Sequence, residues 1–273
     1  MTALPETQAI RLERSGPLLR LWLNRPEMRN AMSRQMTEEI LATFAAISAD
    51  RSIRIVLLRG AGGTFCAGGD IKNMSLSGEP PLPGTSDPLL EGNRRFGQMM
   101  EAVNQAPQAV VAVIEGHAMG GGFGLACVAD ITIARADARF AMSEVTLGIV
   151  PAAISPFVVR RIGLTQARRF GVSGARLDGT EAAAIGIAHL VVADEAALDE
   201  AIARTLDQIL ACAPGAVAET KRLMHRAASA APMAELLDQA AVSFVAAVRG
   251  AEGREGTRAF VEKRKPAWFD KVP

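Results

Sequence analysis

Two glycine-rich segments are the part of this sequence whose residue types and spacing point most directly to chemistry. Residues 60–70 read GAGGTFCAGGD and residues 116–124 read GHAMGGGFG. Glycine lets the backbone adopt unusual dihedral angles and lets a ligand approach the main chain closely. The first N–H groups of a helix that follows such a loop have no partner within that helix and carry partial positive charge. Two such loops side by side would direct two N–H groups at one negatively charged oxygen, as in an oxyanion hole.

The two loops lack the signatures of the common phosphate-binding motifs. Neither ends in the GK[ST] sequence of a P-loop, and no GxGxxG follows the first buried strand. The chain also lacks a GxSxG segment, which excludes the nucleophile elbow of a serine hydrolase. Plain tight turns would explain one such loop, and spacing alone leaves that alternative open for both.

Short apolar runs predict the strands that must hold these loops. The runs at residues 53–58 and 109–114 are rich in β-branched residues, as is typical of strands buried in a sheet. Each of them leads directly into one of the two glycine segments. The predicted strands are residues 18–23, 53–58, 109–114, 130–134 and 139–141. Helical spacing begins after Ser33, a candidate N-cap, and recurs at residues 91–104. Residues 75–90 are rich in Pro, Gly and Ser and predict an irregular connection.

The C-terminal part of the chain is predicted to be largely helical from residue 165. From Leu198 the helices have apolar faces that a compact α/β core would not obviously need, and such faces commonly pack against another subunit. We therefore divide the chain into a core, residues 1–197, which holds the active site, and a helical region, residues 198–273.

Composition indicates an ordinary globular protein of the cytoplasm. The 273 residues are 49% hydrophobic with a formal net charge of +1. Charges of one sign do not cluster into a long run, which argues against a nucleic-acid groove or a basic membrane patch. No segment reads as a signal peptide or reaches the roughly 20 apolar residues of a membrane span. Cys66, Cys127 and Cys212 have no metal-ligand spacing and suggest reduced, structural thiols.

Five segments in order resemble one family. They are LNRPEMRNAM at 23–32, GAGGTFCAGGDI at 60–71, GHAMGGG at 116–122, DITIA at 130–134 and FAMSEVTLGI at 140–149. This set closely resembles the enoyl-CoA hydratase/isomerase (crotonase) superfamily over essentially the whole chain. The resemblance implies an α/β fold, a spiral of ββα repeats followed by a C-terminal helical trimerisation region. It also implies a homotrimer or a dimer of trimers.

The resemblance assigns roles to particular residues. The N–H groups of Gly69 and Gly121 match the family's oxyanion donors, and Glu144 matches a catalytic glutamate. The residues that it places at the coenzyme A thioester are Met28, Ala67, Gly68, Asp70, Ile71, His117, Gly120, Phe260 and Lys263. His117 is equally well explained as a hydrogen-bonded structural histidine. The resemblance implies no metal and no separate cofactor, because coenzyme A is part of the substrate.

One expected carboxylate is missing. Typical hydratases of the family carry a second glutamate where this chain has Gly124. Adding water to a double bond requires the water to be oriented at Cβ and a proton to be supplied at Cα, so Glu144 must serve both or another group must hold the water. Asp70 is expected to cap the next helix, and Asp130 to organise backbone at the head of a strand, so neither is predicted to replace it. Cys66 lacks a partner histidine and is discounted as a nucleophile.

The segment LGIVPAAISPFVVR at 147–160, together with Gly124, is similar to the branched glutaconyl-CoA hydratases. This resemblance favours hydration of a 3-alkylglutaconyl-CoA, with isohexenylglutaconyl-CoA of acyclic terpene catabolism preferred over 3-methylglutaconyl-CoA of leucine catabolism. The alternatives are a one-base enoyl-CoA isomerase and a non-catalytic scaffold or RNA-binding relative.

Overall fold

The structure, a computed structural model, describes residues 3–70 and 84–270. Within these residues six strands form one sheet in the order β1-β2-β3-β4-β6-β9. They are β1 (Ile10–Ser15), β2 (Leu18–Leu23), β3 (Ile55–Gly60), β4 (Ala109–Ile114), β6 (Ile131–Arg135) and β9 (Leu190–Val192). Only β1 and β2 pair in antiparallel fashion, and the other neighbours are parallel. All six residues of β4 are buried, which explains its unbroken apolar sequence.

Three short strands form a second sheet. It joins β5 (His117–Met119), β7 (Arg139–Ala141) and β8 (Arg176–Asp178) within the described residues. The strand β5 is the part of the second glycine segment between the end of β4 and the triple glycine. The second loop is therefore held as a sheet strand over three residues and is free to turn only after Met119.

Four helices cover one face of the large sheet in the described part of the chain. They are α1 (Arg34–Ile47), α3 (Pro88–Asn104), α4 (Gly121–Val128) and α5 (Ser155–Ser173). Successive pairs of these helices contact one another, and their apolar side chains form the larger core with the sheet. Ser33 is the N-cap of α1, as predicted, because its hydroxyl accepts the Met36 N–H.

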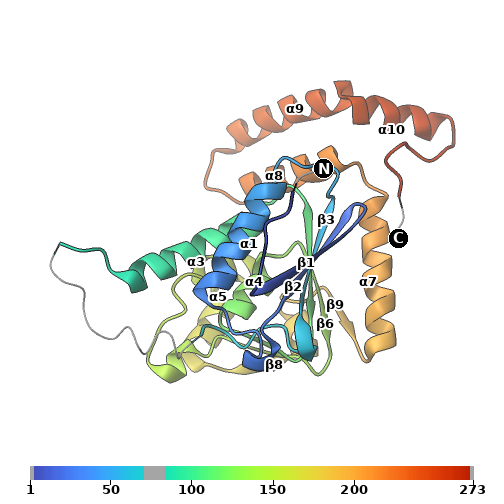
Figure 1. The fold of residues 1–273 in the computed structure, drawn as a ribbon. Helices are drawn as coiled ribbons and strands as arrows, with labels where there is room; N and C mark the ends of the chain where they lie inside the picture. Colours follow the sequence, from blue (N-terminus) through green and yellow to red (C-terminus); the bar gives the residue numbers. More distant parts are fainter. Residues whose placement is uncertain (1–2, 71–83, 271–273) are drawn as a thin grey trace.

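The opposite face of the sheet is covered by α7 (Glu195–Leu210), which lies alongside it in Figure 1. The apolar stripe of α7, which includes Leu198, Ile202 and Leu206, packs against strand residues such as Leu57 and Val111. The interpretation that the helices from Leu198 onward have apolar faces beyond the needs of the core is therefore wrong for α7. It fits α9 (Met233–Arg249), whose apolar side chains are exposed.

The last two helices project from the body. After α8 (Pro214–Ala227), the chain forms α9 (Met233–Arg249) and α10 (Ala251–Val261), which extend over the top of the molecule in Figure 1. Leu237, Val242 and Phe244 on α9 are each more than 60% exposed. Among the helices of residues 3–70 and 84–270, none combines the length and the apolar sequence that a membrane span requires.

The α/β architecture is confirmed, and the boundaries of some elements differ from prediction. The strand at 109–114 is found as predicted, whereas α3 starts at Pro88, after an Asp87 N-cap, and α5 starts at Ser155. The strands β1, β5, β8 and β9 were not predicted. The described residues also contain 3-10 turns and the short helix α6 (Gly179–Ala184). Most of the irregular connection expected at 75–90 lies outside the described residues.

Candidate active site

A strained turn between β2 and α1 fixes the first glycine loop. It begins with the 3-10 helix η1 (Pro26–Met28), and Arg29 and Asn30 then have left-handed φ values of 50° and 55°. The buried Asn30 side chain accepts the Arg25 N–H at 2.8 Å and donates to the carbonyls of Ala61 and Thr64 at 2.8 and 2.6 Å. Asn30 is not among the residues predicted for the site. The feature that could have indicated its role is the residue type, because asparagine tolerates a left-handed backbone conformation and its side chain can form hydrogen bonds with nearby main-chain groups.

Backbone hydrogen bonds then orient the first loop. Met32 donates its N–H to the Gly68 carbonyl at 2.7 Å and accepts the Asp70 N–H at 3.1 Å. In a trans peptide the carbonyl of one residue and the N–H of the next point in opposite directions. Because the Gly68 carbonyl faces Met32, the Gly69 N–H points away from Met32.

The other flank of the loop is joined to β5. Cys66 donates its N–H to the His117 carbonyl at 2.7 Å and accepts the Met119 N–H at 2.9 Å. Gly68 lies against the turn at Gly120, because a Cβ placed on Gly120 would lie 3.6 Å from the Gly68 Cα. The two glycine loops, separated by about fifty residues in the sequence, are therefore in direct contact.

The second loop turns sharply into helix α4. Gly120 has φ 47° and donates its N–H to the Ala141 carbonyl at 2.9 Å, and α4 begins at Gly121. The Gly121 N–H therefore belongs to the group at a helix start that has no intrahelical acceptor. Among the described residues, no acceptor is found for the N–H of Gly69 or of Gly121. A Cβ on Gly121 would meet the ring of Phe96 at 2.8 Å, so the α3 side chain closes this turn from one side.

Glu144 lies on another side of the turn at Gly120 and Gly121. It is the first residue of the 3-10 helix η3 (Glu144–Leu147), and a Cβ on Gly120 would lie 2.9 Å from its Oε1. Its Oε2 atom is buried and finds no hydrogen-bond partner within the described residues. Burial raises the pKa of the Glu144 carboxyl. A half-buried carboxyl of raised pKa beside unpaired N–H groups is suited to proton transfer.

The space for a second carboxylate is filled. A Cβ on Gly124 would lie only 2.4 Å from Cγ2 of Ile154 and 3.0 Å from Cε of Met100. Both of these side chains are buried, at 2% and 0% exposure. The position where the resemblance places a second glutamate is therefore an apolar contact between α4, α3 and the segment before α5.

The two aspartates considered as substitutes are engaged elsewhere. The Asp70 carboxylate is 3.1 Å from Nη1 of Arg25, and the helix that Asp70 was expected to cap lies outside the described residues. Asp130 accepts the Val110 N–H at 2.8 Å and pairs with Lys221 Nζ at 2.7 Å. The prediction that Asp130 organises backbone at the head of a strand is confirmed, and the ion pair also attaches α8 to the core.

Several residues assigned to coenzyme A gather near the first loop. Met28 ends η1, and the Ala67 N–H donates to the carbonyl of the adjacent Arg29 at 2.9 Å, so these two segments are neighbours. Ile71 lies outside the described residues. His117 contributes its carbonyl to the loop contact, while its Nδ1 atom is buried without a hydrogen-bond partner in the described part of the chain.

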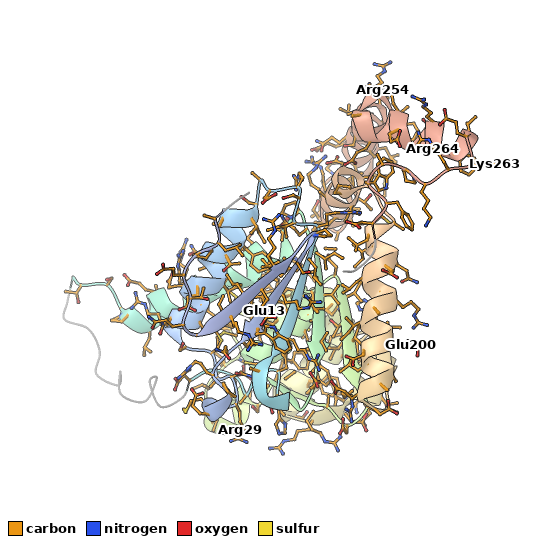
Figure 2. The ribbon with its side chains drawn as sticks, turned by 45° about the vertical axis from the view of Figure 1, so that its right-hand side comes forward. Glu13, Arg29, Glu200, Arg254, Lys263 and Arg264 are labelled. Carbon is orange, nitrogen blue, oxygen red and sulfur yellow. The ribbon has the colours of Figure 1, made fainter. Side chains whose placement is uncertain are left out.

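Phe260 and Lys263 lie far from that cluster within one chain. Figure 2 shows Lys263 and Arg29 at opposite ends of the molecule. Phe260, near the end of α10, is 85% exposed, and Lys263 follows with a left-handed φ of 53°. The structure does not bring them to the Met28 and Ala67 segments of the same chain.

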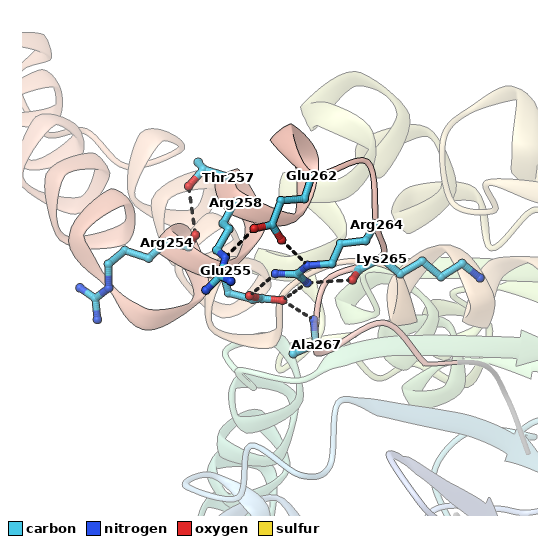
Figure 3. A network of polar contacts seen from close by, with 8 residues as sticks. All are labelled: Arg254, Glu255, Thr257, Arg258, Glu262, Arg264, Lys265 and Ala267. Carbon is cyan, nitrogen blue, oxygen red and sulfur yellow. Dashed lines mark hydrogen bonds and ion pairs between the residues drawn. The ribbon is translucent and has the colours of Figure 1, made fainter.

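An ion-pair network shapes the turn that carries Lys263. Arg264 reaches the Glu255 carboxylate at 2.6 and 2.9 Å and Glu262 at 2.7 Å, as Figure 3 shows. Glu255 also accepts the Ala267 N–H at 2.8 Å, and the arginine beside it lowers the pKa of Glu255 to about 2. Residues 263–267 therefore form a folded turn in which Arg264 is paired with two glutamates.

Known proteins resemble this chain in sequence and in fold. The profile of the enoyl-CoA hydratase/isomerase family matches residues 13–271. The chain is 50% identical to AtuE from Pseudomonas aeruginosa, with a TM-score of 0.92 and coverage of 96% of this chain and 100% of that one. An enoyl-CoA hydratase/isomerase from Marinobacter aquaeolei is 51% identical, with a TM-score of 0.92 and coverage of 96% and 99%. A carnitinyl-CoA dehydratase from Proteus mirabilis is 33% identical over 96% of this chain and 98% of its own. The chain therefore belongs to the enoyl-CoA hydratase/isomerase family.

Proposed function

We propose that this protein hydrates a branched 3-alkylglutaconyl-CoA, with isohexenylglutaconyl-CoA as the preferred substrate. Enoyl-CoA hydratase-type activity on an acyl-CoA thioester follows from the family and from relatives named as hydratases and dehydratases. The observation that carries the catalytic assignment is the contact of Glu144 with the Gly120 turn, directly beside the N–H of Gly121.

In the proposed reaction the thioester carbonyl accepts the N–H groups of Gly69 and Gly121. Water attacks Cβ, and the negative charge that develops on the thioester oxygen is stabilised by these two donors. The oxygen of water bonds to Cβ and a proton is delivered to Cα, so the net change is addition of one water molecule. Glu144 accepts a proton from the attacking water and returns one to Cα. Its raised pKa suits both steps.

The partly exposed Phe96 ring, which lies against Gly121, supports a substrate with a hydrocarbon branch. Ile154 and Met100 are buried and fill the space next to Gly124, so no polar group is available from that position. Apolar side chains favour contact with a hydrocarbon group and cannot orient water. A branch at Cβ also makes the product a tertiary alcohol. The similarity of residues 147–160 to the branched glutaconyl-CoA hydratases supports the same substrate class, with 3-methylglutaconyl-CoA as the smaller alternative.

The second candidate is a one-base enoyl-CoA isomerase. It is favoured by the same observation, because moving a proton between two carbons needs one carboxylate, and Glu144 is the carboxylate beside the turn. Turnover in ¹⁸O-labelled water separates the two reactions. A hydratase incorporates the label into the product, whereas an isomerase leaves the product unlabelled, and that second result would refute hydration.

The substrate assignment is tested with crotonyl-, 3-methylglutaconyl- and isohexenylglutaconyl-CoA. We expect kcat/KM to be highest for the isohexenyl compound, and highest activity with crotonyl-CoA would refute the branched-substrate proposal.

Glu144→Gln is expected to abolish turnover while acyl-CoA affinity is retained. Near-normal turnover in this variant would refute the role of Glu144. Failure of the wild-type protein to bind any acyl-CoA would instead favour a non-catalytic scaffold or RNA-binding role.

We also propose that the chain assembles as a homotrimer or a dimer of trimers, with residues 198–273 providing contacts beyond the core of residues 1–197. The exposed apolar residues of α9 support this proposal. The position of Lys263, at the opposite end of the molecule from Arg29 in Figure 2, supports contact of Phe260 and Lys263 with coenzyme A bound to a neighbouring subunit. Coenzyme A enters as part of the substrate, and the proposed reaction uses no other cofactor.

A further inference from the structure

The buried thiol of Cys66 lies between the two peptide segments that carry the proposed oxyanion donors. Its Sγ is 3.8 Å from the Gly68 carbonyl oxygen, which also accepts the Met32 N–H at 2.7 Å. That carbonyl belongs to the same peptide unit as the Gly69 N–H. Contacts to the carbonyl end of a peptide fix the direction of its N–H and polarise it.

On its other side, Cys66 touches the start of α4. A Cβ on Gly122 would lie 2.6 Å from the Cys66 Cβ and 3.2 Å from its Sγ, so the backbone of Gly122 is packed directly on this side chain. Gly122 is the residue immediately after the second proposed donor, Gly121. Cys66 is therefore in contact with both loops at positions next to their free N–H groups.

The protonation state of the thiol excludes a nucleophilic role. Burial raises the pKa of Cys66 to about 11, although hydrogen bonds with the backbones of Gly68 and Gly122 oppose this shift. At neutral pH the group is a neutral S–H, which is able to donate weakly to a carbonyl and to accept from an N–H. A neutral group of fixed size can set a distance between two backbones without adding charge to the site.

We propose that Cys66 is a positioning residue that sets the spacing and direction of the Gly69 and Gly121 N–H groups. This inference rests on the proposed function, because it requires those N–H groups to bind the thioester oxygen. Removing the thiol would leave both donors present but would allow the two loops to approach or rotate. Misplacing a donor should lower kcat by about 10- to 100-fold, less than the roughly 10²–10³-fold loss on removing a donor outright.

The test compares Cys66→Ala and Cys66→Ser with Cys127→Ala. Cys127 is a matched control because it is also buried with a thiol pKa raised by burial, and it lies on α4 near the end remote from Gly121. The first readout is the C=O stretch of bound butyryl-CoA labelled with ¹³C at the thioester carbon. This probe is saturated and cannot be hydrated. The second readout is kcat and KM with the best substrate of the acyl-CoA panel.

We expect wild type and Cys127→Ala to shift the C=O stretch to lower frequency on binding, and Cys66→Ala to shift it less. Cys66→Ser, which keeps a small hydrogen-bonding group, should recover part of the shift and of kcat. KM should change little in all variants. An equal shift in wild type and Cys66→Ala would overturn the positioning role alone. Absence of any shift in wild type would overturn the proposed oxyanion hole together with it.

Discussion

The contact between Gly124 and Ile154 yields a prediction whose size follows from the structure. In Gly124→Ala the new methyl group would be placed 2.4 Å from Cγ2 of Ile154 and 3.0 Å from Cε of Met100. Favourable carbon–carbon contacts lie at about 3.5–4.0 Å, so the overlap with Ile154 exceeds about 1 Å. Both neighbouring side chains are buried and packed within the core, which limits their ability to move aside.

The expected energies follow from three effects. Overpacking costs about 1–3 kcal/mol, and replacing glycine by alanine within a helix returns about 1 kcal/mol, so Gly124→Ala should destabilise by about 0–2 kcal/mol. Ile154→Ala alone creates a cavity and should cost about 2–5 kcal/mol. In the double variant the alanine methyl enters the space left by Ile154. The double variant should therefore be more stable than the sum of the single changes predicts, by about 1–3 kcal/mol.

Urea unfolding of the four proteins at one fixed protein concentration measures this coupling, since assembly of subunits stabilises the folded state by mass action. The control cycle pairs Gly124→Ala with Leu198→Ala. Leu198 is equally buried but packs on the opposite face of the sheet, so that cycle should be additive within about 0.5 kcal/mol. Additivity in the Gly124–Ile154 cycle would refute the conclusion that Ile154 occupies the side-chain space at position 124.

Two further predictions concern Glu144 and the exposed face of α9. Because burial raises the pKa of Glu144 above 4.5, the folded protein binds more protons than the unfolded chain between that value and the raised pKa. The free energy of unfolding of wild type, minus that of Glu144→Gln, should therefore fall as pH rises through this window. A difference that rises with pH in thermal unfolding would contradict the burial argument. Phe244→Asp, on the 70% exposed Phe244 side chain, should lower the mass measured by light scattering, whereas the same charge added by Gln208→Asp on α7 should not. A monomeric wild type would contradict the assembly proposal.

Local sequence patterns were sufficient for the central elements of the fold. The apolar run at 109–114 is the strand β4, because a run of this kind can be buried on both sides of a parallel sheet. The strands β5 and β8 were not predicted, because their three residues show no strand pattern of their own and they are defined by pairing with β7. The apolar stripe of α7 was recognised in sequence, but periodicity does not say whether such a stripe faces the chain's own sheet or another subunit.

Residue types alone indicate where the backbone can turn sharply and where a carboxylate is available: the two glycine loops, Glu144, and the missing glutamate at position 124. How these parts meet is set by the tertiary structure. It placed Gly68 against Gly120, packed Cys66 on Gly122, and filled the space at Gly124 with Ile154. The reason is physical. Backbone freedom and hydrophobic period are properties of neighbouring residues, whereas the distance between two loops depends on how the strands and helices between them pack.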